Sequence, residues 1–429
     1  MSEHPVRAAG RYRPVLNRPN EVAMKHAFVS GGVCAPKGFR ASGVHCGIRK
    51  NRDKRDLALI VSDVPCTCAA LFTSNLVKGA PIEVSRAHLW NSRAQAIIAN
   101  SGNANTCNAD GLEVADAMCR LVESYTGIIE DDVLVASTGV IGQPLSIDPI
   151  RTGMQDLVDH LGYDQSLQAN EAIMTTDTKP KEVAVSFTLG GKTCTIGGIA
   201  KGSGMIHPNL ATMLVFLTSD AAISTTLLDK ALRDDVADTF NMVSVDGDTS
   251  TNDTLFLLAN GLCGNAMIEE ENEDYRTFCA ALRMLTQELC RRIAADGEGA
   301  TRLLLVNVTG AKTKDDARRA AKSVACSSLT KAAIFGADAN WGRVLCAIGY
   351  SGADVDITGV DVDFVSAAGK IAVCRDGAGV NFSEDKAKRI LLESEITVDI
   401  RLRDGKESAT AYGCDLTYDY VRINGDYRT

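Results

Sequence analysis

The sequence has no hydrophobic run long enough to cross a membrane. In 429 residues the longest apolar stretches, such as 57–61 and 303–308, have the length of strands, whereas a transmembrane helix needs about 18 or more apolar residues. Acidic residues are in excess, with 54 Asp+Glu against 45 Lys+Arg and a net charge of −9. That balance argues against a broad face for nucleic-acid phosphates. We therefore expect neither a membrane nor a nucleic acid as partner.

The motifs of common metal and nucleotide sites are also missing. The 14 cysteines include no CxxC, and the six histidines include no HxxxH or HExxH, so we expect no metal. Residues 189–193 (LGGKT) end like a phosphate-binding loop, but Ser186 occupies the position of its first glycine. Residues 246–253 start like a calcium loop, but Ser250 and Thr251 occupy positions that need Asp or Asn and then Gly. No GxGxxG or GxSxG is present, so we expect no cofactor.

The N-terminal region and the cysteines indicate a cytoplasmic protein. The first thirty residues lack the apolar segment of a secretory signal. Residues 1–27, rich in arginine and proline, are predicted to be a flexible arm. A transit peptide would also be arginine-rich, but the spacing of Pro5, Pro14 and Pro19 disfavours the amphipathic helix that it needs. Most of the cysteines are expected to be reduced, small and buried.

Hydrophobic periodicity predicts alternating strands and helices. Short β-rich runs closed by Gly, Ser or Asp predict strands at 57–63, 95–102, 131–139 and 183–189. A period of 3.6 predicts helices at 114–125, 228–240 and 278–293. Near the C-terminus, 396–402 and 416–423 alternate like half-buried antiparallel strands. Strands in clusters with helices between them indicate layered α+β or α/β packing.

Five segments rich in small polar residues follow the predicted strands. They are 99–111, 136–142, 174–181, 197–217 and 243–254. Such segments bring backbone N–H groups and hydroxyls together, which suits recognition of carboxylates and of developing oxyanions. The alternative is that they simply form turns. The residues alone leave the two explanations about equally supported.

The segment 201–217 carries one residue type that can act as a nucleophile after self-cleavage. A glycine-rich loop with Lys201 is followed by Ala211-Thr212 and an apolar run. A threonine hydroxyl needs an adjacent base, and cleavage of the bond before it frees its own α-amine for that role. An α-amine has a pKa of about 7.7–8.0, near enough to neutrality to accept a proton. Without further information, an ordinary threonine at the start of a strand is the favoured interpretation of Thr212.

Four long motifs supply that information. The chain resembles the ornithine acetyltransferase (glutamate N-acetyltransferase) family of arginine biosynthesis in four motifs, which occur in the same order along the chain. They are ASTGVIG (136–142), KGSGMIHPNLATML (201–214), GADANWGR (336–343) and CDLTYDYVRINGDYRT (414–429). The resemblance covers about residues 28–429. It implies an α+β layered sandwich with β-sheets between helical layers. It also implies self-cleavage at Ala211-Thr212 into an α chain (28–211, after the arm) and a β chain (212–429), assembled as α2β2.

The resemblance also implies the functional residues. Thr212 matches the nucleophile, and Thr138 and Gly139 match the pair that stabilises the oxyanion. The positions that match substrate contacts are Thr175, Lys201, Thr212, Glu298, Asn424 and Thr429. An ammonium and hydroxyls suit the carboxylate and amide of an acyl-amino acid, and the Glu298 carboxylate suits the amine of ornithine.

The implied reaction is a ping-pong transfer of acetyl from N-acetylornithine to glutamate. It needs no metal or prosthetic group. Whether acetyl-CoA also serves as donor is left open, since no residue decides it. Two alternatives remain: a self-cleaving aminopeptidase or amidase of similar fold, in which water replaces glutamate, and a small-molecule binding protein that is never cleaved.

Overall fold

The computed structural model describes residues 26–207 and 213–426, which form two β-sheets. The larger sheet has the strand order β1-β6-β7-β8-β9-β3-β4-β5, with β2 paired to β3. Its strands are β1 (His26–Val29), β2 (Phe39–Val44), β3 (Leu57–Phe72), β4 (Arg93–Asn103), β5 (Val133–Val140), β6 (Lys181–Leu189), β7 (Lys192–Lys201), β8 (Leu214–Ser219) and β9 (Thr254–Ala259). The four predicted strands between 57 and 189 are confirmed. His26 and Ala27, expected in the arm, pair with β6.

The larger sheet folds into two stacked layers at strand β3. Pairing between β3 and β4 shifts in register between Val61 and Cys66, and such a bulge bends a strand. The first part of β3 pairs with β2 and β4, and the last part pairs with β9. A buried cluster that includes Ile97, Phe216 and Phe256 fills the space between the layers, as in face-to-face sheet packing.

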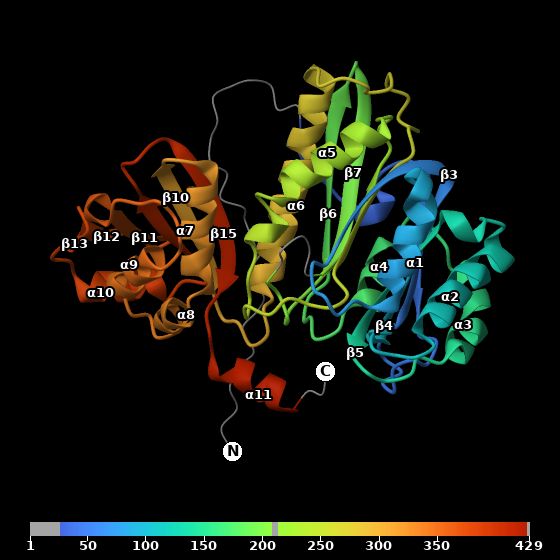
Figure 1. The fold of residues 1–429 in the computed structure, drawn as a ribbon, viewed down its shortest axis with the longest axis horizontal. Helices are drawn as coiled ribbons and strands as arrows, with labels where there is room; N and C mark the ends of the chain where they lie inside the picture. The colour runs from blue at the N-terminus through green and yellow to red at the C-terminus, as the bar shows by residue number, and fades with distance from the viewer. Residues whose placement is uncertain (1–25, 208–212, 427–429) are drawn as a thin grey trace.

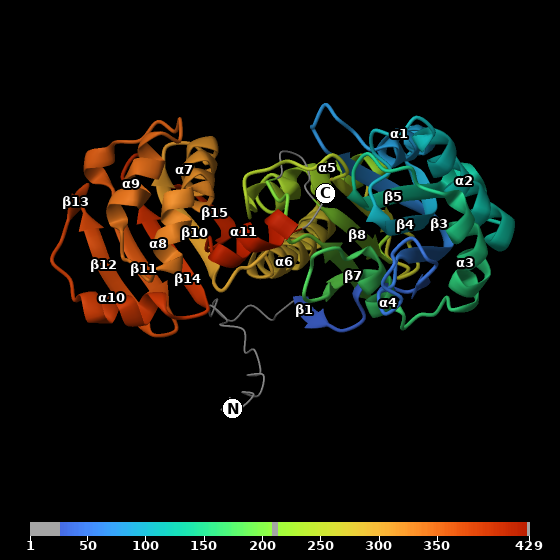
Figure 2. The ribbon, with the colours of Figure 1, turned by 90° about the horizontal axis from the view of Figure 1, so that it is seen from below.

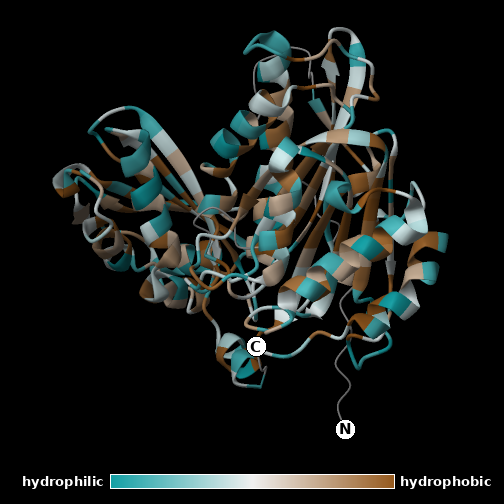
Figure 3. Ribbon diagram, turned by 45° about the vertical axis from the view of Figure 1, so that its right-hand side comes forward, coloured by the Kyte–Doolittle hydropathy of each residue, from teal (hydrophilic) through white to brown (hydrophobic). Residues whose placement is uncertain are grey.

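Helices cover both outer faces of this double layer (Figure 1). On one side lie α1 (Ala80–His88), α2 (Gly111–Thr126) and α3 (Ile147–Asp159), and on the other α5 (Thr225–Val236) and α6 (Glu273–Ala295). The predicted apolar stripes point inward, as Met118 and Val122 of α2 and Leu285 and Leu289 of α6 show. Colouring by hydropathy places the apolar residues on the strands between the helices (Figure 3). The predicted α+β layered sandwich is confirmed.

The second sheet lies beside the sandwich and has its own helices (Figure 1). Its order is β13-β12-β11-β14-β10-β15. The strands are β10 (Leu303–Ala311), β11 (Asp361–Ser366), β12 (Gly369–Arg375), β13 (Ala378–Gly379), β14 (Glu395–Arg401) and β15 (Glu407–Cys414), and the helices are α7 (Lys314–Cys326), α8 (Ser328–Phe335), α9 (Trp341–Gly349) and α10 (Glu384–Leu391). The strand predicted at 396–402 is β14. It is antiparallel to β11 but parallel to β10.

The strand predicted at 416–423 is wrong, because this segment forms helix α11 (Tyr418–Asp426) (Figure 2). Thr417 precedes it, and its hydroxyl accepts a hydrogen bond from the Tyr420 N–H at 3.3 Å, as an N-cap does. Tyr418 and Val421 are 83% and 69% exposed. The alternation therefore does not mark one buried face, and the chain leaves the sheet after β15.

Two of the cysteines, most of which were expected to be reduced, are paired with each other. Cys194 of β7 and Cys263, after β9, form a disulfide. Seven of the remaining cysteines are buried, while Cys107 and Cys346 are exposed. In the part of the chain that the structure describes, no helix is both long and apolar enough to cross a bilayer.

Candidate functional site

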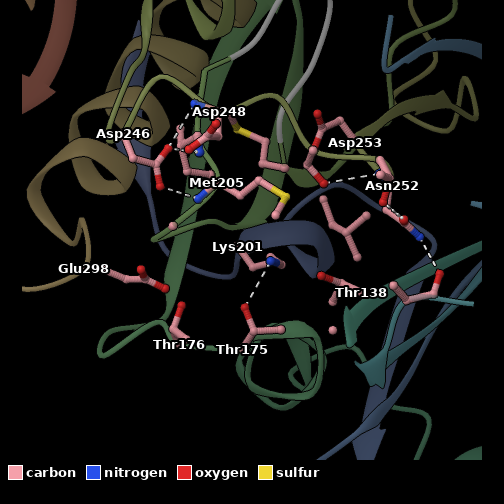
Figure 4. A pocket seen from close by; sticks show the side chains of 18 of the residues that line it. Thr138, Thr175, Thr176, Lys201, Met205, Asp246, Asp248, Asn252, Asp253 and Glu298 are labelled. Carbon is pink, nitrogen blue, oxygen red and sulfur yellow. Dashed lines mark hydrogen bonds between the residues drawn. The ribbon is translucent and has the colours of Figure 1, made fainter. Parts of the chain in front are cut away.

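A pocket opens where strands β4, β5 and β7 end and β8 and β9 begin (Figure 4). It encloses about 150 Å³. Six of the residues predicted from the sequence line it, from both ends of the chain: Thr138, Gly139, Thr175, Lys201, Glu298 and Asn424. Ala211, Thr212 and Thr429 lie outside the described residues. Ile206 and Met213, on either side of the 208–212 segment, both line the pocket.

The wall of the pocket that carries Thr138 and Gly139 is the end of β5, which lies parallel to β4. Gly139 is paired with Gly102 and has a φ of 134°, a conformation that glycine adopts without strain. A Cβ at this position would lie 2.4 Å from the carbonyl carbon of Gly102. Only glycine therefore allows the two backbones to approach this closely, which fixes the turn after Thr138. Thr138 is buried and borders the cavity.

The side chain of Asn252 connects the two strands of this wall, and the sequence did not single out this residue. Its amide Nδ2 donates to the carbonyl oxygens of Ala104 at 2.5 Å and Ser137 at 2.9 Å. Its Oδ1 accepts the hydroxyl of Thr106 at 2.6 Å. The side chain thus fastens together the ends of β4 and β5. The neighbouring Asp253 is also buried and lines the pocket.

The sequence predicted that Lys201 lies in a glycine-rich loop. In the structure it is the last residue of strand β7. Its ammonium donates to the Thr175 hydroxyl at 3.1 Å. Burial lowers the pKa of Lys201, while the carboxylates of Asp177 and Asp253 oppose that change. A cation held in a buried pocket by nearby carboxylates can bind the carboxylate of a substrate.

Behind Lys201 a buried ion cluster fixes the loop that carries Thr175. The Lys181 ammonium donates to Asp177 and to Asp296, both at 2.6 Å. Asp177 also accepts the backbone N–H of Gly202 at 2.7 Å and that of Thr175 at 3.1 Å. Burial alone would raise the pKa of Asp177, but Lys181 and Lys201 outweigh it and hold the pKa at about 2. Asp177 therefore stays ionised at neutral pH and fixes the backbones of Thr175 and Gly202 beside the cavity.

Glu298 and Asn424 meet on the opposite wall. Glu298 follows α6, and its backbone N–H donates to the carbonyl oxygen of Ser203 at 2.9 Å. Its carboxylate accepts the Asn424 amide at 2.7 Å. A Cβ on Gly204 would lie 2.4 Å from this carboxylate, so glycine leaves room for it. Helix α11 thus brings Asn424 into the site, with one carboxylate oxygen of Glu298 engaged.

A second acid, Asp246, holds the turn that precedes the predicted cleavage segment. Its carboxylate accepts the N–H groups of Met205 at 2.6 Å and Ile206 at 2.9 Å. Met205 has a φ of +55°, a strained conformation for a residue with a side chain. Tyr420 of α11 donates its hydroxyl to the same carboxylate at 3.3 Å. Asp246 therefore links α11 to the turn.

His207 ends the described chain before the gap and is held in its neutral form. Its Nδ1 lies 3.1 Å from the Ser244 hydroxyl and 3.5 Å from the Cys326 thiol. Burial, and then the charge of Lys322, lower the pKa of His207 to about 4.

The pocket therefore combines the buried cation of Lys201, the carboxylate of Glu298 and the turn at Gly139, where strand β5 ends. Asp246, Asn252 and Tyr420 were missed as individual residues. The sequence did mark 243–254 as a polar segment, which is the signal that points to the first two. In the described residues, the one group of side chains with metal-ligand spacing is Cys194, Asp220 and Cys263, away from this pocket.

Comparison with known proteins gives extensive matches. The sequence model of the ArgJ family matches residues 40–429. The chain is 50% identical over 392 residues to the "Arginine biosynthesis bifunctional protein ArgJ 1" of Clostridium acetobutylicum, covering 91% of this chain and 96% of that protein. It is 50% identical over 404 residues to the corresponding protein of Symbiobacterium thermophilum, covering 94% and 100%. A crystal structure of the Bacillus halodurans protein, 43% identical, covers 50% of this chain and 100% of that chain with a TM-score of 0.48.

Proposed function

Because this chain belongs to the ArgJ family, and is therefore an acyltransferase of arginine biosynthesis, we propose that it moves the acetyl group of N-acetylornithine to glutamate through an acetyl-enzyme on Thr212. The observation that carries the proposal is the convergence of Thr138, Gly139, Lys201 and Glu298 on one pocket. These residues come from strand ends and a helix end far apart in the sequence.

The substrate's polar groups match the walls of the pocket. In the proposed complex, Lys201 and the hydroxyl of Thr175 bind the α-carboxylate of N-acetylornithine. Glu298, with one oxygen held by Asn424, receives the side-chain ammonium. The acetyl carbonyl then lies toward Thr138 and Gly139. Glutamate, which lacks the side-chain ammonium, uses the same Lys201 contact.

In the first half-reaction the Thr212 oxygen attacks the acetyl carbonyl carbon. The α-amine of Thr212 takes the hydroxyl proton, and Thr138 and Gly139 stabilise the tetrahedral oxyanion. The carbon–nitrogen bond breaks, the proton passes to the departing nitrogen, and ornithine leaves. In the second half-reaction the amine of glutamate attacks the ester. The bond to the Thr212 oxygen breaks, and that oxygen recovers a proton.

The nucleophile arises by cleavage of Ala211-Thr212, giving α and β chains that we propose assemble as α2β2 and act in the cytoplasm. Support for cleavage at this bond comes from the described residues on either side of it, whose backbones are fixed. Asp246 fixes Met205 and Ile206 on one side. On the other side Thr254 N donates to the Met213 carbonyl at 2.9 Å.

A denaturing gel with N-terminal sequencing tests the proposal. The wild-type protein is expected to give two chains, the second starting Thr212-Met213-Leu214, while Thr212→Ala stays a single chain because it lacks the hydroxyl for the N→O acyl shift. Wild-type protein with acetyl-ornithine is expected to form an acetyl-enzyme that glutamate discharges. An alanine variant that cleaves, or an acetyl-enzyme whose lifetime does not depend on glutamate, contradicts the proposal. The second outcome indicates a hydrolase.

A further inference from the structure

The three residues before the predicted cleavage segment form a turn whose backbone is fixed on both sides. We call residues 205–207 the processing turn. The carboxylate of Asp246 accepts two of its backbone N–H groups, at 2.6 and 2.9 Å (Figure 4). The Val245 N–H and the Thr249 hydroxyl donate to two of its carbonyl oxygens, at 2.7 and 2.8 Å. These contacts offset the cost of the left-handed conformation of Met205, whose φ is +55°.

The far end of the cleavage segment is fixed as well. The Met213 carbonyl accepts the Thr254 N–H at 2.9 Å, and strand β8 begins at Leu214. Only five residues, 208–212, separate this end from the processing turn. Fixing both ends of a short segment restricts its conformations, and a reaction within one segment is faster when its geometry is restricted. The hold on the processing turn therefore bears on the rate of self-cleavage at Ala211-Thr212.

The segment that carries Asp246 depends in turn on the last elements of the chain. The Ser244 N–H donates to the carbonyl of Tyr412 in β15 at 2.8 Å, and Val243 forms a parallel bridge with the same residue. Helix α11 follows β15, and Tyr420 donates its hydroxyl to the Asp246 carboxylate at 3.3 Å. A turn in the middle of the sequence is thus held by elements that are synthesised last.

Helix α11 reaches Asp246 because its backbone rests directly on the loop after α6. A Cβ on Gly299 would lie 2.6 Å from the Tyr420 nitrogen, so only glycine permits this approach. The Thr417 hydroxyl donates to the Gly299 carbonyl at 2.7 Å and fixes the start of the helix. Burial, and then the charge of Asp246, raise the pKa of Tyr420. The phenol therefore stays protonated and is the donor in its bond to the carboxylate.

We propose that Tyr420 is a positioning residue for self-cleavage, which acts through Asp246 on the processing turn, so that the precursor is cleaved only after α11 has docked. The inference rests on the proposed function, which supplies the cleavage at Ala211-Thr212. It gives the C-terminal helix a part in processing, separate from the proposed substrate contact of Asn424. A chain in which α11 is not yet folded lacks this hold on the turn and stays a precursor.

The reaction that the turn positions is an N→O acyl shift followed by hydrolysis. The Thr212 oxygen attacks the carbonyl carbon of Ala211, the carbon–nitrogen bond breaks, and the hydroxyl proton passes to the departing nitrogen. Water then attacks the resulting ester and its carbon–oxygen bond breaks. The products are the carboxylate of Ala211 and the free amine and hydroxyl of Thr212. Tyr420 and Asp246 exchange no proton with these groups and act by position alone.

The test follows the cleavage of pulse-labelled, full-length chains made by cell-free translation, on denaturing gels over time. The variants are Tyr420→Phe, which removes only the hydroxyl, Asp246→Asn, and the two combined. Tyr418→Phe is the matched control, since it removes the same group from a residue of the same helix that is 83% exposed. The melting temperature of each variant in a Thr212→Ala background reports on the fold of the uncleaved precursor.

Tyr420→Phe is expected to slow cleavage about tenfold, since a hydrogen bond to a charged group is worth about that factor, while the melting temperature stays unchanged. Asp246→Asn is expected to slow cleavage further, because a side-chain amide has one accepting oxygen in place of two. The combined variant is expected to match Asp246→Asn within about twofold, because the hydroxyl acts only through that carboxylate. Tyr418→Phe is expected to be cleaved at the wild-type rate.

Three results would overturn the inference. One is a Tyr420→Phe chain that is cleaved as fast as the Tyr418→Phe control. Another is a combined variant in which the two losses multiply, and the third is a melting temperature that falls together with the rate. If Asp246→Asn does not fold, the comparison of the two tyrosine variants decides. A wild-type chain that is never cleaved counts against the proposed function itself and removes the inference with it.

Discussion

Replacing Lys181 by methionine removes the one cation that sits between Asp177 and Asp296. Both contacts are 2.6 Å long, and the Lys181 side chain is 1% exposed. Removing one partner of a buried ion pair typically costs about 3–5 kcal/mol, because the remaining charge is left uncompensated. The drop in the pKa of Asp177 from 3.8 to about 2 corresponds to about 2–3 kcal/mol, part of it due to Lys201. We therefore expect Lys181→Met to lose about 3–5 kcal/mol at neutral pH.

The loss should also depend on pH, which separates it from a simple packing defect. Because the folded pKa of Asp177 lies below its ordinary value, its contribution to stability is present above about pH 4 and disappears as the pH falls towards 2. Without Lys181 the buried carboxylates bind protons more readily. The gap in stability between the variant and the wild type should therefore shrink as the pH is lowered from 7.5 to 4.5.

Urea titrations followed by circular dichroism at these two pH values measure both effects. Lys179→Met is the matched control, since Lys179 is exposed and only two residues away, and it should change the free energy of unfolding by less than about 0.5 kcal/mol. A Lys181→Met variant within 1 kcal/mol of this control at pH 7.5 would refute the assigned role of the cluster. So would a loss that is the same at both pH values.

Three further predictions follow from the site. Thr138→Ala should lower kcat by about 10²–10³ with little change in ornithine binding, and a loss of less than about threefold would remove Thr138 as an oxyanion donor. Deleting Tyr427–Thr429 should raise KM for N-acetylornithine or abolish turnover while leaving self-cleavage intact; normal kinetics in the truncated protein would contradict this. Since the pKa of His207 is lowered to about 4, folding stability should decrease as the pH falls from about 6.5 to 4. His207→Asn should flatten that part of the curve in thermal denaturation, and an unchanged slope would show that another group is responsible.

The sandwich could be predicted because each of its strands and helices shows the spacing of apolar residues typical of its type within its own short stretch of sequence. The run at 95–102 lies inside β4, and the stripe at 278–293 lies inside α6. The spacing of buried residues is enough to identify such elements. Helix α11 was mistaken for a strand because its polar and apolar residues alternate by chance. Its only local helix signal is the N-cap Thr417, since little of the helix is buried.

Residues of the pocket were predicted only through the resemblance to a known family. Thr138, Lys201 and Glu298 were identified through the family resemblance, and the structure brings them together. Asp246 and Asn252 act through partners 174 and 148 residues away, Tyr420 and Ala104. No periodicity or spacing encodes such contacts, because they depend on how the two layers of the sheet and the C-terminal helix pack.

The pairing of β7 with β8 has a consequence for how the molecule can be made. The six residue pairs from Ile196↔Ser219 to Lys201↔Leu214 lie on either side of the 208–212 segment, and both strands are interior to the sheet. A backbone break between them leaves every one of these pairings in place. If the parts before and after this segment were synthesised as separate polypeptides, β7 in one and β8 in the other would each lack its partner strand. Unpaired apolar strand edges favour aggregation over correct pairing. Expressing the two parts from separate genes should therefore give little active protein.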